Sequence, residues 1–309
     1  MCLVNGARAL RLTVRVRVRT GYGAVVPSGP ERFDVPVAGG AIAAYRWEGD
    51  GPVVLAAHGI TSNHRSWSLV VAALDGAATL VAPDLRGRGR SNGLSGPYGI
   101  ARHADDLAAV LEHAGADTAV VAGHSMGGFV ALAFAERHAA HTTAVVLVDG
   151  GPPLAVPPGI TVDEALAATL GPSMRRLEMT FPNRGAYRAF WQQHPAFAGI
   201  WSDEVDAHTQ HDLVGEPPEM RSSCVKDAVL QDGRELLADQ HVRTLLDHVD
   251  APVHMLWAPR GMVDDPVGLY DERRVAGVDN ELVGDTNHFS ILLGPHGAKR
   301  VAAAIRRAL

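Results

Sequence analysis

The chain has few cysteines and no excess of positive charge. Its 309 residues include only 2 cysteines, Cys2 and Cys224. Cys2 lies close to the start of the chain, so we expect no structural disulfide and a reducing, cytoplasmic location. The formal net charge is −6 at pH 7, whereas a nucleic-acid-binding protein usually carries a basic face. The composition therefore argues against a nucleic-acid partner and leaves the oligomeric state open.

Long uninterrupted apolar runs are also missing. No run approaches the ~20 residues that a membrane-spanning helix needs, so we expect no membrane partner. The first 20 residues contain arginines but no apolar stretch that leads to a small-residue cleavage site, which argues against a signal peptide. Valine and arginine alternate at 14–19, a pattern that an edge strand or a disordered leader can explain. We treat residues 1–31 as an N-terminal extension whose order is open.

From position 33 onward, strand-like and helix-like segments alternate. A hairpin is predicted around Gly39 and Gly40, and residues 100–115 carry apolar side chains at helical spacing. Six further apolar runs have the length and composition of strands: 52–59, 78–84, 118–125, 142–151, 251–258 and 280–285. This order predicts a mostly parallel sheet with helices on both faces.

One long interval breaks this alternation. Residues 152–250 open with the proline-rich stretch "GPPLAVPPG" and continue as successive helical patterns without a convincing strand. We interpret the interval as a helical cap inserted into an α/β core made of residues 32–151 and 251–309. A cap over the carboxyl edge of the sheet would roof a ligand site.

The stretch "VVAGHSMGGFV" carries the strongest functional signal. Gly123, Ser125 and Gly127 form the pattern G-x-S-x-G between a strand-like run and a helix-like run. At such a turn the serine hydroxyl stands above the sheet edge, and glycines on either side allow the backbones to pass closely. Ser125 would also lie at a helix N-terminus, which favours developing negative charge.

This turn at Ser125, called a nucleophile elbow, gives the chain a resemblance to the α/β-hydrolase superfamily over residues 32–309. Three further segments match family motifs in the family's order: "HGITSNHRSW" at 58–67, "DLRGRGRS" at 84–91 and "DTNHFSIL" at 285–292. The resemblance implies a mostly parallel eight-stranded sheet flanked by helices, with Ser125 as nucleophile and His288 as its base. It also implies an oxyanion hole made by the backbone N–H groups of Ile60 and Met126.

Two aspartates compete for the third position of the triad. Asp149 directly follows an apolar strand, 24 residues after Ser125, as in dehalogenase-like members of the family. Asp264 stands where the family's acid is most often found, but about six residues beyond the predicted strand end. We favour Asp149 narrowly, keep Asp264 as the alternative, and leave smaller weight on Asp265 and Asp285.

No metal site or cofactor is predicted. The histidines His64, His103 and His113 lie in separate segments without ligand-like spacing, and the cysteines form no C-x-x-C pair. The segment "DLRGRGRS" lacks the spacing of a phosphate loop, so we expect a structural role for Arg86 and Arg88, with a substrate contact as the alternative.

The expected activity is hydrolysis of a carboxylic ester or lactone of a small apolar molecule through an acyl-enzyme. Cleavage of a C–C bond, a lyase, cofactor-free oxygenase or cyclase reaction, and a binding protein without turnover remain alternatives. Large apolar side chains in the cap predict an apolar pocket. Its candidate lining residues are His64, Trp67, Phe181 and Trp191, with Asn63 at its edge.

Overall fold

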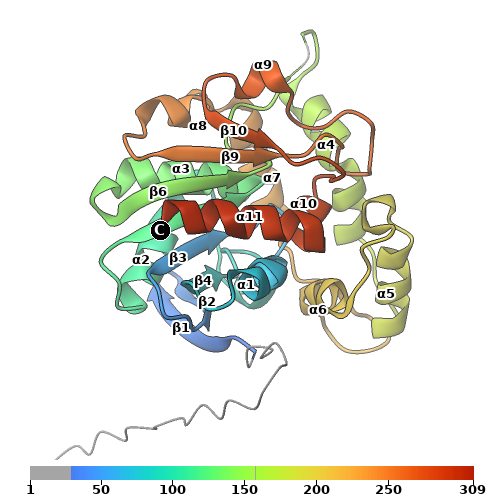
Figure 1. The fold of residues 1–309 in the computed structure, drawn as a ribbon. Coiled ribbons are helices and arrows are strands. Elements are labelled where there is room, and N and C mark those ends of the chain that lie inside the picture. The colour runs from blue at the N-terminus through green and yellow to red at the C-terminus, as the bar shows by residue number, and fades with distance from the viewer. Residues whose placement is uncertain (1–28, 157) are drawn as a thin grey trace, which may run out of the picture.

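The computed structural model describes residues 29–156 and 158–309 (Figure 1). The strand pattern considered for 14–19 and most of the N-terminal extension lie outside this range. Within the described residues, no helix combines the length and the apolar character needed to cross a bilayer.

A single sheet of eight strands forms the centre of the protein and confirms the predicted fold class. Its strand order is β1-β2-β4-β3-β5-β6-β9-β10. The first two strands pair antiparallel with their neighbours, and all pairs from β4 to β10 are parallel. The strands are β1 Glu31–Val37, β2 Gly40–Trp47, β3 Val53–Ala57, β4 Thr79–Pro83, β5 Ala119–His124, β6 Thr142–Val148, β9 Val253–Trp257 and β10 Asp279–Leu282.

Both faces of this sheet are covered, which explains the continuous apolar runs in the sequence. The helices of the core are α1 Ser68–Leu74, α2 Ile100–His113, α3 Met126–Arg137, α9 Glu272–Val275, α10 Ser290–Leu293 and α11 Pro295–Ala308. One face packs against α1, α10 and α11, and the other packs against α2 and α3. In Figure 1, α11 crosses the near face of the sheet.

The inserted segment is mainly helical, as predicted. Its helices are α4 Val162–Leu177, α5 Arg184–Gln192, α6 Asp203–Asp212, α7 Lys226–Ala238 and α8 Gln240–Thr244. The expectation that it contains no strand was wrong in one detail. Leu213–Val214 (β7) and Arg221–Ser222 (β8) pair antiparallel, and two-residue strands are too short to leave a period-2 pattern. Five short 3-10 turns complete the fold: η1 His64–Trp67, η2 Gly89–Ser91, η3 Ala139–His141, η4 Pro195–Phe197 and η5 Leu245–His248.

Arg86 and Arg88 hold loops together, which is the structural role that we expected for them from the sequence. Arg86 makes a paired contact with Asp106, with both N–O distances at 2.8 Å. Arg88 donates to the Ile60 carbonyl oxygen at 2.9 Å and forms an ion pair at 2.6 Å with Asp232 of α7. Both arginines are buried, so neither lies free on the surface.

Asp232 is the point at which α7 is fastened to the core. Its carboxylate also accepts from the Gly99 N–H at 2.7 Å and lies 2.9 Å from Nε2 of His103. Burial alone would raise the pKa of the Asp232 carboxyl. The contacts of this carboxylate with His103 and with the positive charge of Arg88 outweigh burial and hold its pKa well below the usual value. The buried carboxylate is therefore ionised and compensated at neutral pH.

We predict that Asp232→Asn lowers the free energy of unfolding by about 3–5 kcal/mol, because Arg88 then carries a buried charge without its partner. Urea titration followed by circular dichroism measures this change. The control Asp163→Asn removes the exposed partner of Arg234 and should leave stability nearly unchanged. Equal effects of the two substitutions would contradict the assigned role of Asp232.

Candidate active site

Ser125 lies at a sharp turn between β5 and α3. Its backbone angles are φ 56° and ψ −124°, a region that residues other than glycine rarely adopt. The flanking glycines are required by close contacts: a Cβ atom on Gly123 would lie 2.0 Å from the Gly127 carbonyl oxygen, and one on Gly127 would lie 2.2 Å from that of Ala57. The turn is therefore strained and held in place by its surroundings.

The loop after β3 approaches this turn from the side. A Cβ atom on Gly59 would lie 3.2 Å from the Ser125 Cβ atom, so glycine lets the loop come close to the hydroxyl. Met126 is the first residue of α3, where the backbone N–H has no partner within the helix. Ile60 follows Gly59 and lines the same cavity as Ser125. Both predicted N–H donors thus belong to segments that meet at Ser125.

His288 connects Ser125 to a buried carboxylate. Its Nε2 lies 3.1 Å from the Ser125 Oγ, and its Nδ1 lies 2.6 Å from Oδ2 of Asp149. The other oxygen of Asp149 accepts from the Ala258 N–H at 3.0 Å. Because a carboxylate can only accept, Nδ1 carries a proton and Nε2 is free to accept the serine proton. Asp149 itself is fully buried.

The alternative acid, Asp264, has other partners. It accepts from the Asn287 side-chain amide at 2.9 Å and pairs with Arg260 at the same distance. Its side chain is 35% exposed. Asn287 precedes His288, and its Oδ1 also caps the turn that follows by accepting from Phe289 and Ser290. Asp264 therefore braces the histidine loop from outside, whereas Asp149 contacts the imidazole ring.

A second histidine supports the first. His124 precedes Ser125, and its Nε2 donates to the His288 carbonyl oxygen at 2.8 Å while the two rings lie 4.8 Å apart. Burial and the nearby His288 lower the pKa of His124 well below its usual value, so it stays neutral. The contact joins segments 164 residues apart, and no local sequence pattern indicated it.

Ser125 opens into a small cavity under the cap. The lining residues are mostly apolar or small: Gly59, Ile60, Thr61, Ser62, Ser66, His124, Ser125, Trp191, Phe197, His208, Met262, His288, Phe289, Leu292 and Leu293. The free volume is about 30 Å³. A wider groove beside α2 and α3 does not include Ser125. Ser125 itself is half-buried, so the cavity is narrow but not sealed from solvent.

The predicted pocket residues divide into one that lines this cavity and three that do not. Trp191 lines it. Trp67 is fully buried in the core between the sheet and α1, and Phe181 packs against Tyr187 inside the cap. His64 is also fully buried and turns toward Asp84. The prediction for these three residues was wrong because proximity in sequence to the loop or cap does not determine which way a side chain points.

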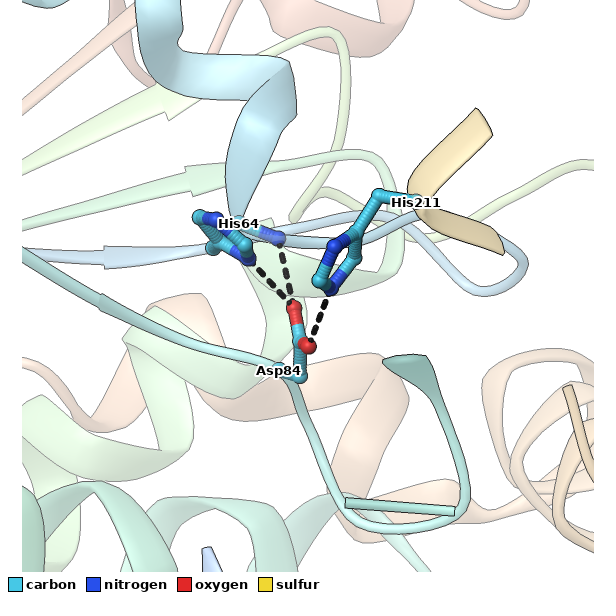
Figure 2. Close-up of side chains that lie close together, drawn as sticks. All are labelled: His64, Asp84 and His211. Carbon is cyan, nitrogen blue, oxygen red and sulfur yellow. Dashed lines mark hydrogen bonds and ion pairs between the residues drawn. The ribbon is translucent and has the colours of Figure 1, made fainter. Parts of the chain in front are cut away.

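His64, Asp84 and His211 form a buried cluster that the sequence spacing had not indicated. Figure 2 shows both rings pointing at the carboxylate, from His64 Nδ1 at 2.8 Å and from His211 Nε2 at 2.7 Å. The backbone N–H groups of His64 and Arg90 donate to the same carboxylate at 3.0 and 2.8 Å. His211 belongs to α6, so the cluster fastens the cap to the core beside the site.

These three residue types can also hold a metal ion, and their candidate ligand atoms lie within 4.8 Å of one another. The surroundings fit such an ion poorly. All four donors around Asp84 are already hydrogen-bonded to it, and a metal would displace the two ring contacts. A metal-bound histidine usually donates its other N–H to a partner, whereas Nε2 of His64 is buried with no partner among the described residues. The cluster is better explained as a set of hydrogen bonds that join α6 of the cap to the core.

Several histidines are held neutral by burial, with a consequence for stability. Burial lowers the pKa of His58 to about 3, of His64 to about 4 and of His208 to about 3. In the unfolded chain a histidine has a pKa near 6.5. Below that pH the unfolded state binds more protons than the folded state, so these groups favour unfolding increasingly as the pH falls.

We predict that the free energy of unfolding is steady above pH 6.5 and falls from pH 6.5 to 4. The slope should be on the order of 1 kcal/mol per pH unit for each buried histidine. Urea titrations at intervals of half a pH unit measure it. The variant His241→Gln changes an exposed histidine and should keep the slope of the parent. A stability that does not change over this interval would contradict the prediction.

Comparison with known proteins places this chain in a family. Residues 52–295 match the family model described as alpha/beta hydrolase fold. An N-formylmaleamate deformylase of Pseudomonas putida is 31% identical over 251 residues, which cover 71% of this chain and 91% of that protein. An uncharacterised protein of Mycobacterium tuberculosis is 35% identical over 108 residues, so the match spans only 32% of that relative's length and 35% of this chain.

Solved structures agree on the fold. The crystal structure of E-2-(acetamidomethylene)succinate hydrolase matches 90% of this chain and 98% of its own chain with a TM-score of 0.75. Its sequence identity of 20% supports a shared fold and nothing about substrate.

Proposed function

Because this chain belongs to the alpha/beta hydrolase fold family, we propose that it is a serine hydrolase with Ser125, His288 and Asp149 as its catalytic triad. The observation that carries the proposal is the unbroken chain of contacts from the Ser125 hydroxyl through the His288 ring to the Asp149 carboxylate, at 3.1 and 2.6 Å. The bond to be cleaved is a carboxylic ester or lactone.

Each group has a defined part in this mechanism. His288 Nε2 takes the proton of Ser125 as Oγ attacks the carbonyl carbon, and Asp149 stabilises the imidazolium that forms. The Ile60 and Met126 N–H groups donate to the oxyanion. As the tetrahedral intermediate collapses, the C–O bond to the leaving group breaks and His288 returns the proton to it. Water then attacks the acyl-enzyme with the same help from His288 and releases the acid.

The narrow cavity bears on how a substrate reaches Ser125. A free volume of about 30 Å³ is small for an acyl group, so we expect side chains that line the cavity to shift when an ester binds. Trp191 of α5 and Phe289 are the large side chains nearest to this role, because both line the cavity. We propose that these two side chains shift as a substrate binds while α6 and α7 stay in place, which would exclude water from the attack step.

An amide bond is the second candidate. The Pseudomonas putida relative is a deformylase by name, and its alignment with this chain covers 91% of that protein. The same triad chemistry can act on an ester or an amide. Comparing p-nitrophenyl acetate with p-nitroacetanilide and p-nitroformanilide tests the bond type. Faster turnover of either anilide would favour the amide, whereas turnover of the ester alone would favour the esterase proposal.

We predict that Asp149→Asn lowers kcat for p-nitrophenyl acetate by about ten-thousand-fold, because the amide stabilises the wrong tautomer of His288. The matched control Asp264→Asn, on the neighbouring loop, should stay within about tenfold of the parent. Steady-state kinetics measure both. The reverse order of the two variants would make Asp264 the catalytic acid.

A fluorophosphonate probe tests the nucleophile independently. We predict that it labels the parent on Ser125 and does not label Ser125→Ala, since only a serine activated by its base attacks the phosphorus atom at a useful rate. Mass spectrometry of the tryptic peptide locates the adduct. An unlabelled parent under folded conditions would refute the serine-hydrolase proposal.

A further inference from the structure

Two buried polar atoms without a hydrogen-bond partner among the described residues belong to side chains that line the cavity around Ser125. They are Oγ of Ser66 in η1 and Nδ1 of His208 in α6. The two residues are only 1% and 8% exposed. A buried polar group without a partner costs about 1–3 kcal/mol, so this pair is poorly explained by the fold alone.

The backbone segments that carry Ser66 and His208 are joined to each other. The Asn63 side chain connects their segments: its Oδ1 accepts from the Arg65 N–H at 3.1 Å, and its Nδ2 donates to the His208 carbonyl oxygen at 3.1 Å. One turn further along α6, His211 is bonded to Asp84 (Figure 2). These contacts fix α6 against η1 and keep Ser66 and His208 among the residues that line the cavity.

Two other lining residues, His124 and Trp191, also carry a buried nitrogen without a hydrogen-bond partner among the described residues. Nδ1 of His124 lies near the backbone of Gly59, since a Cβ atom there would lie 3.4 Å from it. The Trp191 ring lies under the guanidinium of Arg176, 5.0 Å from the ring centre. Ser66 and His208 differ from these two because Asn63 joins the segments that carry them.

The charge of the cavity limits what this pair can bind. Among the described residues that line it, none is lysine, arginine, aspartate or glutamate. Burial lowers the pKa of His208 to about 3, so its ring is neutral at physiological pH. A neutral imidazole offers one donor and one acceptor, and a serine hydroxyl offers both. A carboxylate placed here would lack a counter-ion, whereas a neutral polar group would not need one.

We propose that Ser66 and His208 form a polar recognition site that binds a neutral amide or hydroxyl group of the substrate beside the bond that Ser125 attacks. This inference rests on the proposed serine-hydrolase function and narrows its substrate class. The sequence predicted an ester or lactone of a small apolar molecule, whereas this inference expects a substrate that also carries a hydrogen-bonding group. Satisfying both buried atoms makes binding selective, because an analogue that lacks this group leaves them unpaired.

The labelling rate of Ser125 by matched fluorophosphonates tests the inference. One probe carries a six-atom alkyl chain, and the second carries an amide within a chain of the same length. We expect the parent to react about tenfold faster with the amide probe, as a gain of about 1.4 kcal/mol implies. Ser66→Ala and His208→Leu should bring this ratio close to one while the alkyl probe reacts within about threefold of the parent rate.

Matched controls separate recognition from structure. Ser62→Ala removes a hydroxyl from the same cavity lining and should keep the parent ratio, and Ser66→Thr, which retains a hydroxyl, should keep most of it. Equal rates with both probes in the parent, or equal slowing of both in Ser66→Ala, would overturn the inference. So would fastest labelling by a third probe with a carboxylate in place of the amide. No labelling by any probe would refute the proposed function instead, and this inference with it.

Discussion

The hydrogen bond between His288 and Asp149 is the interaction on which the rest of the site depends. Asp149 is fully buried after β6, and an ionised carboxylate in such a place is tolerated only when it is well bonded. Its partners are the His288 ring at 2.6 Å and the Ala258 N–H at 3.0 Å. This bond orients the imidazole toward Ser125 and draws together the ends of strands that are distant in sequence.

The cap is fastened to the core by a second set of buried charges. Asp232 of α7 holds Arg88, and His211 of α6 holds Asp84. Arg88 also donates to the carbonyl oxygen of Ile60, whose N–H is one of the two predicted oxyanion donors. The contacts between cap and core and the loops of the candidate site thus share the residue Arg88, so the position of α7 and the order of the loop at Ile60 depend on the same side chain.

The sequence predicted what local rules determine. The elbow at Ser125 needs glycines at fixed positions, and the alternation of strands and helices needs only apolar periodicity, so both were visible. The choice between Asp149 and Asp264 stayed open because each follows a strand, and the sequence alone does not say which carboxylate faces His288. Trp67 and Phe181 were misplaced because large apolar side chains serve a core as readily as a pocket. The cluster at Asp84 combines residues 20 and 127 positions apart, which no spacing rule detects.

Proton NMR of the folded protein tests the central interaction most directly. A short, buried bond from His288 Nδ1–H to Asp149 should give a resonance far downfield of the amide region. We predict that this resonance is present in the parent, persists in Asp264→Ala and is absent in Asp149→Ala. Its persistence in Asp149→Ala, or its loss in Asp264→Ala with the fold intact, would contradict the assignment of Asp149 as the partner of the catalytic histidine.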